Sequence, residues 1–213
     1  MLEVIIIIED ILQLNGLSIE ILEQLSYRSQ LNKSLKQNLH YFDKDALMRE
    51  LSAMVKWLQV QSVLEDISLD FRIKSIDSIK QKYNRYYPNR QVRQVFNDIL
   101  GFRAFCDDYR QLICCDKGRT ELKIVDMRKG KAVDDGYRGV HIYYQKDNFY
   151  YPIEIQFNTI YDRQINNWLH DYLYKKDYPD EIGKNMRFLY EAGKIRNAEN
   201  FEEMLRNELL HNC

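Results

Sequence analysis

The chain has 213 residues, of which 45% are hydrophobic and 30% are charged, and its 31 basic side chains nearly cancel its 32 acidic ones. This composition excludes a disordered chain, and a protein of this length can bury a core without disulfide or metal cross-links. The formal net charge of -1 gives no indication of the protein's partners.

The cysteines and the longest apolar run bear on the compartment. Cys106, Cys114, Cys115 and Cys213 show no CxxC spacing and lie in no Cys/His cluster, so we expect reduced thiols and no zinc site. The run Val4–Ile8 is too short to span a membrane, and no basic segment precedes it as in a signal peptide. We therefore expect a cytoplasmic protein with no membrane partner.

The first part of the chain, residues 1–66, is predicted to be an N-terminal helical segment. Ser18 is placed to cap its second helix. Apolar side chains recur there at helical spacing, at Ile19, Leu22 and Leu25 and again at Leu47, Leu51, Met54, Val55 and Leu58. We expect helices over most of the stretch from about Ile5 to Leu64.

The pattern changes after about residue 66, where strands and helices alternate. Ser75 is placed to cap a helix, with Asp77 in its first turn and Pro88 beyond its end. Residues 92–96 form either a helical turn or the approach to a strand. The other predicted elements are strands over 69–74, 99–106, 121–127, 139–145 and 150–157, and helices over 76–86, 109–115, 161–175 and 199–210.

This order of elements predicts an α+β fold with a mixed central sheet flanked by helices. The strands over 139–145 and 150–157 are expected to form a hairpin. We assign residues 67–178 to the core and residues 179–213 to a C-terminal helical segment. The last helix carries an apolar stripe that either packs on this chain's own core or joins copies into a homo-oligomer, at Phe201, Met204, Leu205 and Leu209.

Positive charge is concentrated between residues 72 and 103, where only Asp77 and Asp98 oppose eight basic residues. The basic residues are Arg72, Lys74, Lys80, Lys82, Arg85, Arg90, Arg93 and Arg103. They surround a strand-to-helix junction, where backbone N–H groups also favour anions, so a polyphosphate is a natural ligand. The alternative interpretation is a solvated basic helix face.

Two carboxylates lie among apolar strand residues. Asp98 opens the strand over 99–106, and Glu154 lies inside the strand over 150–157. A charged group in this setting is costly unless it is paired or bound to a metal, and two carboxylates plus substrate phosphates suit Mg²⁺. Glu154 is alternatively the base that takes a proton from an attacking hydroxyl. A third interpretation places Glu154 and Gln156 on a solvated sheet face.

A glycine-containing loop supplies a further set of candidate residues. Tyr137 lies between Gly136 and Gly139 and is able to stack on a base, while His141, Lys129 and Lys131 are candidates to contact phosphates. The alternative is a hairpin turn with solvent-exposed lysines.

Four ordered motifs together resemble the RelA/SpoT synthetase family, whose members have a nucleotidyltransferase-like fold and make alarmones. The motifs are RIKSIDSI at 72–79, DILGFR at 98–103, GYRGVH at 136–141 and IEIQFNT at 153–159. They are similar to the family patterns R-x-K-S-x-x-S-I, D-I-x-G-x-R, G-Y-x-S-x-H and E-I-Q-I-R-T, and the match covers roughly residues 69–176.

The resemblance implies a Mg²⁺-dependent enzyme that transfers the β,γ-pyrophosphoryl group of ATP to GDP or GTP. Arg72 and Arg103 would flank the adenine. Asp98 would bind Mg²⁺, with Glu154 as a second ligand or as the base. The ATP phosphates would be held by Lys74, Ser78 and either Lys80 or Lys82. The acceptor would be bound by Tyr137, which stacks on its base, and by His141, Gln156 and Lys129 or Lys131.

The departures from the family patterns lie on the acceptor side. Asn158 replaces the usual Arg of E-I-Q-I-R-T, Gly139 replaces the Ser of the tyrosine motif, and no Glu precedes His170 in the following helix. A second hypothesis is therefore a toxin that pyrophosphorylates the 3′ end of tRNA and has an antitoxin partner. A basic surface continuous with the tyrosine motif would favour it, although Glu121 and Asp126 dilute that surface, for which the candidates are Lys117, Arg119, Lys123, Arg128, Lys129 and Lys131.

Two other functions fit the sequence less well. A non-catalytic nucleotide- or RNA-binding regulator would not need the two carboxylates and Tyr137 together. The dipeptide His170-Asp171 is similar to part of the hydrolase signature of long family members, but that site needs further His and Asp ligands and the chain has only four His. We therefore expect no hydrolase site.

Overall fold

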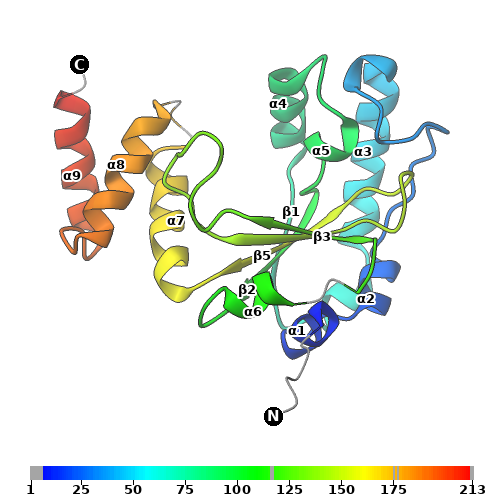
Figure 1. Cartoon of the computed structure of the whole chain (residues 1–213). Coiled ribbons are helices and arrows are strands. Elements are labelled where there is room, and N and C mark those ends of the chain that lie inside the picture. Colours follow the sequence, from blue (N-terminus) through cyan, green and yellow to red (C-terminus); the bar gives the residue numbers. More distant parts are fainter. Residues whose placement is uncertain (1–6, 116–117, 175, 177, 212–213) are drawn as a thin grey trace, which may run out of the picture. The chain divides into compact units, whose positions relative to one another are not determined.

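The structure is a computed structural model that describes residues 7–115, 118–174, 176 and 178–211 (Figure 1). Most of the apolar run at 4–8, together with Lys117 and Cys213, lies outside the described residues. The chain divides into two compact units: unit 1 is Met1–Ala104, Gln111–Ile124 and His141–Gln156, and unit 2 is Phe105–Arg110, Val125–Val140 and Phe157–Cys213. The predicted division at residues 66 and 178 stays a prediction.

A five-stranded sheet in the order β1-β2-β5-β4-β3 confirms the α+β class. Its strands are β1 (Asp70–Ile73), β2 (Leu100–Phe105), β3 (Leu122–Asp126), β4 (Val140–Tyr144) and β5 (Ile153–Asn158). The predicted partners β4 and β5 are neighbours. β1 pairs antiparallel with β2, and its Arg72 lies opposite Gly101.

Helices cover both faces of the sheet in unit 1 (Figure 1). On one face are α3 (Lys44–Gln59), α4 (Ile76–Tyr86) and α5 (Val92–Val95), and on the other are α1 (Ile8–Leu14) and α2 (Ile19–Gln24). The short helices are η1 (Leu39–Tyr41), η2 (Ser62–Leu64) and α6 (Arg110–Cys114), whose first residue belongs to unit 2. The segment left open at 92–96 is thus helical.

The two predicted serine caps are confirmed. Ser18 Oγ accepts a hydrogen bond from the Ile21 backbone at 3.3 Å, and Ser75 Oγ accepts one from Ser78 N at 3.3 Å. A serine oxygen at this position satisfies an N–H that has no partner inside the helix. The Ser75 cap fixes the start of α4 directly after β1, so it sets where the basic residues of this helix begin.

The expectation of helix over most of the N-terminal segment is wrong for residues 26–38. This stretch consists of bends and turns, and the backbone amides of Ser29 and Leu35 each donate to a backbone carbonyl in the loop between β4 and β5 at 2.8 Å. Buried Glu50 of α3 also holds it, because its carboxylate accepts from Ser29 Oγ at 2.8 Å and from the Gln30 amide at 2.6 Å. These tertiary hydrogen bonds replace those of a helix.

Unit 2 contains α7 (Ile160–Tyr172), α8 (Asp180–Glu191) and α9 (Ala198–His211), of which α8 has no counterpart among the individually predicted helices. The three helices share a core in which Phe201 and Leu205 of the predicted stripe are buried. The stripe therefore packs within its own chain. Residues 134–136 approach α8 closely: a Cβ on Gly136, whose φ is +86°, would lie 2.3 Å from the Gly183 carbonyl oxygen.

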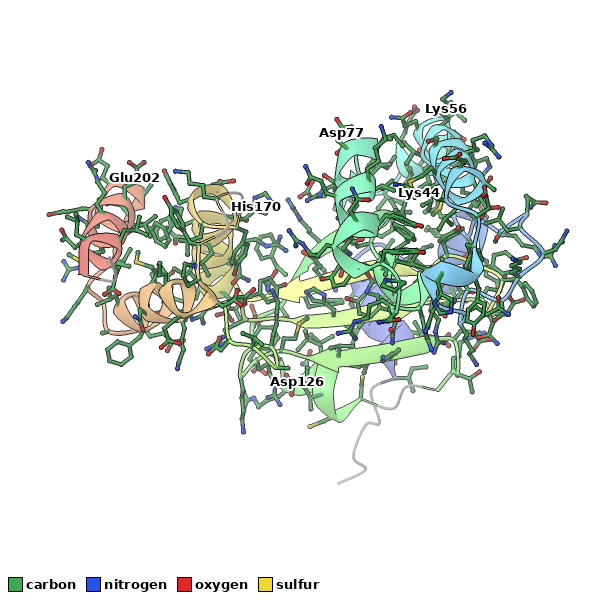
Figure 2. All side chains as sticks on the ribbon, turned by 90° about the horizontal axis from the view of Figure 1, so that it is seen from above. Lys44, Lys56, Asp77, Asp126, His170 and Glu202 are labelled. Atoms are coloured by element: carbon green, nitrogen blue, oxygen red, sulfur yellow. The ribbon has the colours of Figure 1, made fainter. Side chains whose placement is uncertain are left out.

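Among the described residues, no helix combines the length and the apolar character needed to cross a membrane. No group of three or more His, Cys, Asp or Glu residues with metal-binding geometry occurs in the same part of the chain. His170 lies on α7 (Figure 2). Its Nδ1 is 3.2 Å from the Asp171 carboxylate, and both side chains are about half exposed.

Candidate active site

Strand register brings the two predicted adenine-binding arginines together in unit 1. Arg72 lies opposite Gly101, and Arg103 follows Gly101 by two residues on β2. Because side chains alternate along a strand, all three positions share one face of the sheet. Glycine leaves that face open at position 101, where a Cβ would lie 3.5 Å from Glu154 Oε2.

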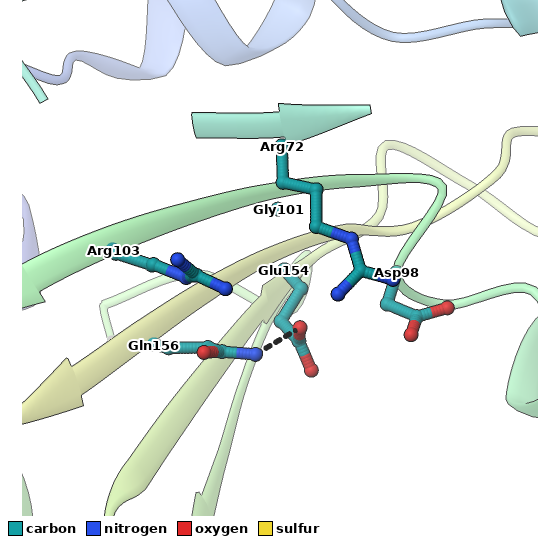
Figure 3. Close-up of a pocket in the computed structure, with 6 residues that line it drawn as sticks. All are labelled: Arg72, Asp98, Gly101, Arg103, Glu154 and Gln156. Atoms are coloured by element: carbon teal, nitrogen blue, oxygen red, sulfur yellow. Dashed lines mark hydrogen bonds between the residues drawn. The ribbon is translucent and has the colours of Figure 1, made fainter. Parts of the chain in front are cut away.

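A small polar pocket of about 40 Å³ lies on this face. It is lined by Arg72, Asp98, Gly101, Arg103, Glu154 and Gln156 (Figure 3). The guanidinium of Arg72 reaches between the carboxylates of Asp98 and Glu154. The space has room for a few water molecules between these polar side chains.

Asp98 is held between two lysines. Lys74 Nζ lies 2.7 Å from one carboxylate oxygen and Lys82 Nζ lies 2.9 Å from the other, and all three side chains are less than one quarter exposed. Burial lowers the pKa of Lys74, although Asp98 opposes this effect. The cluster carries a formal charge of +1, which favours an incoming polyphosphate.

Glu154 is buried on β5 and accepts three short contacts. The Tyr143 hydroxyl donates to it at 2.8 Å, Gln156 Nε2 donates at 2.7 Å, and His141 Nδ1 lies 3.0 Å away. Burial favours the neutral acid, but the hydrogen bond and the charge of His141, with the hydrogen bonds from Tyr143 and Gln156, outweigh it and lower the pKa of Glu154 to about 2. Glu154 is therefore ionised throughout the physiological range.

The two carboxylates fit a magnesium ion. Mg²⁺ prefers hard oxygen ligands and is usually bound by one or two carboxylates together with substrate phosphates and water. Asp98 and Glu154 line the same pocket, so they are the residues that would hold such an ion.

The sequence profile described as "Region found in RelA / SpoT proteins" matches residues 71–178, just over half of the chain. The chain belongs to the RelA/SpoT family. It is accordingly an enzyme of the pyrophosphotransferase class.

Several solved structures are similar to this chain. Small alarmone synthetase 1 from Bacillus subtilis is 21% identical, with 78% of this chain and 97% of that chain covered and a TM-score of 0.41. Small alarmone synthetase 2 from Bacillus subtilis is 23% identical, with coverages of 77% and 91% and a TM-score of 0.42. A GTP pyrophosphokinase family protein from Streptococcus pneumoniae is 22% identical, with coverages of 78% and 91% and a TM-score of 0.39. No curated protein matched the sequence.

Not every candidate of this RelA/SpoT chain lies at the pocket. Lys80 is 61% exposed and lies 3.9 Å from Asp77, whereas Lys82 contacts Asp98. Ser78, in the first turn of α4, accepts a hydrogen bond from the Ser75 hydroxyl at 2.9 Å. The structure thus places Lys82 beside Asp98 and Lys80 on the solvated flank of the helix.

The acceptor candidates divide between the two units. His141 and Gln156 belong to unit 1, where both contact Glu154. Tyr137, Lys129 and Lys131 belong to unit 2. Within that unit, Lys131 pairs with Asp135, and its Nζ lies 5.0 Å from the centre of the Tyr137 ring and 5.5 Å from that of Tyr174. The lysine is therefore part of the packing around Tyr137.

Sequence reasoning missed Tyr143. It lies two residues from His141 on β4, so both side chains point to the same face of the strand, toward Glu154. Alternation along the strand predicts that the two side chains share a face. Nothing in the sequence showed that the Tyr143 hydroxyl would donate a hydrogen bond to Glu154 of the neighbouring strand.

Proposed function

We propose that this enzyme transfers the β,γ-pyrophosphoryl group of ATP to the 3′-hydroxyl of GDP or GTP. The observation that carries the proposal is the pocket in unit 1, where two arginines and two carboxylates meet beside the buried Lys74. Pyrophosphoryl transfer depends mainly on positioning and on neutralising phosphate charge, and this pocket offers both.

In this proposal the donor side works through charge and shape. The planar guanidinium groups of Arg72 and Arg103 stack on the adenine, as is common for arginine. Lys74, Lys82 and Ser78 bind the phosphates, and the two lysines exchange their contact with Asp98 for contact with ATP. Mg²⁺, when bound by Asp98 and Glu154, would offset the charge of the phosphate oxygens.

On the acceptor side, Tyr137 of unit 2 stacks on the base, and Lys129 or Lys131 of the same unit contacts the acceptor's phosphates. In unit 1, His141 and Gln156 hold the Glu154 carboxylate. The alternative acceptor is the 3′ end of tRNA, which needs the same donor chemistry. Two of the basic candidates for that acceptor are paired within their own unit: Arg119 lies 2.5 Å from Glu9, and Arg128 lies 2.9 Å from Asp126.

Radiolabelled ATP tests the proposal. The purified protein is incubated with Mg²⁺ and γ-³²P-ATP, and GDP, GTP and bulk tRNA are offered separately. We expect label in GDP or GTP and, with α-³²P-ATP, an equal amount of labelled AMP. Label in tRNA alone would assign the toxin activity, and ATP binding without transfer to any acceptor would leave a regulator.

The variant Asp98→Asn tests the site within the same assay. It keeps the shape of the side chain but removes the charge that faces Lys74 and Lys82. We expect transfer to fall by at least a hundredfold, as is typical when a principal charge of a phosphoryl-transfer site is lost. The matched control is Asp77→Asn, whose carboxylate is 90% exposed on α4, and it should keep full activity.

A further inference from the structure

In unit 2, two asparagines hold the end of the tyrosine loop, which we define as residues 127–139. The Arg138 carbonyl oxygen accepts hydrogen bonds from Asn158 Nδ2 at 2.8 Å and from Asn166 Nδ2 at 2.7 Å. The loop is also closed on itself, because the Met127 amide donates to the Gly139 carbonyl at 2.9 Å. The backbone that follows Tyr137 is therefore fixed by side chains of β5 and α7.

Gly139 is required here by a close approach of side chains. A Cβ at this position would lie 2.6 Å from Asn158 Nδ2, 2.9 Å from the Tyr137 hydroxyl oxygen and 3.2 Å from the Phe157 carbonyl oxygen. Real Cβ atoms essentially never come closer than 3.0 Å to a neighbour. The φ of Gly139 lies outside the left-handed region, so its backbone conformation is open to any residue.

Asn158 has no free space into which it can retreat. Its side chain is 1% exposed and its amide is bonded to the Arg138 carbonyl. The two departures from the family patterns, Gly139 and Asn158, thus occupy one shared space. A larger residue at 139 would have to displace Asn158, the Tyr137 hydroxyl, or both.

We propose that Gly139 and Asn158 form a coupled pair of positioning residues that sets where Tyr137 presents its ring, and thereby which acceptor the enzyme accepts. The absent side chain at 139 and the asparagine amide together define the space in which the Tyr137 hydroxyl lies. The ligand concerned is the guanine base of the acceptor. This inference rests on the proposed function, in which Tyr137 stacks on that base.

A double-mutant cycle tests the coupling. Gly139→Ala adds only the Cβ, so we expect the KM for GDP or GTP to rise roughly tenfold while the KM for ATP changes less than twofold. Asn158→Ala alone should have a small effect, because Asn166 still donates to the Arg138 carbonyl. In the double variant the contact of the Cβ with Asn158 is gone while that with the Tyr137 hydroxyl remains, so the acceptor KM should recover in part, to a value clearly below that of Gly139→Ala alone.

Asn166→Ala is the matched control. It removes a hydrogen bond to the same carbonyl, but Asn166 is not among the three atoms nearest to the added Cβ. We therefore expect no recovery when it is combined with Gly139→Ala. A neutral Gly139→Ala variant, strictly additive effects in the Gly139/Asn158 cycle, or equal losses in the KM of donor and acceptor would each overturn the pairing.

Failure of the proposed function can be distinguished from failure of the coupling between Gly139 and Asn158. If the wild-type protein transferred label only to tRNA, the same cycle measured with tRNA would still support or overturn the coupling, and only the guanosine acceptor would be lost. If the wild-type protein transferred label to nothing and bound no GDP by equilibrium dialysis, both proposals would fall together.

Discussion

The free energy of unfolding should depend on pH through the buried carboxylate of Glu154. The substitution Glu154→Gln should remove this part of the pH dependence. In the folded protein, hydrogen bonds hold the pKa of Glu154 at about 2, whereas an unfolded glutamate has a pKa of 4.5. A depressed folded-state pKa stabilises the protein above the unfolded pKa, and this stabilisation is lost as the pH falls from about 4.5 toward about 2.

The size of the effect follows from the two pKa values. A difference of about 2.5 units corresponds to roughly 3 kcal/mol of folding free energy at neutral pH. Of this, on the order of 2 kcal/mol should be lost between pH 6 and pH 3. Glu154→Gln cannot ionise, so its free energy of unfolding should fall by that much less over the same interval, although it starts from a lower value.

Urea unfolding followed by circular dichroism at pH 6 and pH 3 measures this difference. Asp77→Asn is the control, since it removes an exposed carboxylate outside the buried cluster. Tyr143→Phe, which deletes one donor to Glu154, should fall between the wild type and Glu154→Gln. Parallel loss of stability in the wild type and Glu154→Gln would refute the assigned hydrogen bonds.

Three further predictions concern activity and stability. Lys82→Met should raise the KM for ATP roughly tenfold, whereas Lys80→Met, on the solvated flank of α4, should change it less than twofold in the same steady-state assay. Tyr137→Ala should raise the acceptor KM far more than the ATP KM, and equal losses would make the residue structural. Gly136→Ala should lower the free energy of unfolding, measured with urea, by at least about 2 kcal/mol, as is usual for strained and overpacked sites. Both the positive φ of Gly136 and the close neighbouring atoms exclude a side chain there.

Much of the fold was predictable because local signals and tertiary packing agree. The apolar alternation of β4 and the serine cap of α4 are both present in the sequence and in the structure. The stretch at 26–38 shows the opposite case, since Leu31 and Leu35 allow a helical pattern. Its backbone instead bonds to the loop between β4 and β5, which no local rule indicates.

The site was predictable as a set of motifs, but its contacts were not. Lys80 and Lys82 lie on opposite flanks of the buried stripe formed by Ile79 and Tyr83, and helical periodicity treats the two flanks alike. Only the position of the sheet decides that Lys82 faces Asp98. In the same way, the motif comparison showed Gly139 and Asn158 as separate departures because it carries no distances.

The salt bridges of Asp98 with Lys74 and Lys82 affect how the affinity for ATP should depend on ionic strength. Both ammonium groups already have a counter-charge inside the protein, so they hold fewer solution ions that ATP must displace. Under the proposed function, Lys74 and Lys82 exchange Asp98 for the phosphates when ATP binds. The release of bound ions, which makes the affinity for a polyphosphate fall with added salt, then contributes less to the binding free energy. We expect the affinity of this enzyme for ATP to vary gently with salt, and to vary more steeply once Asp98 loses its charge.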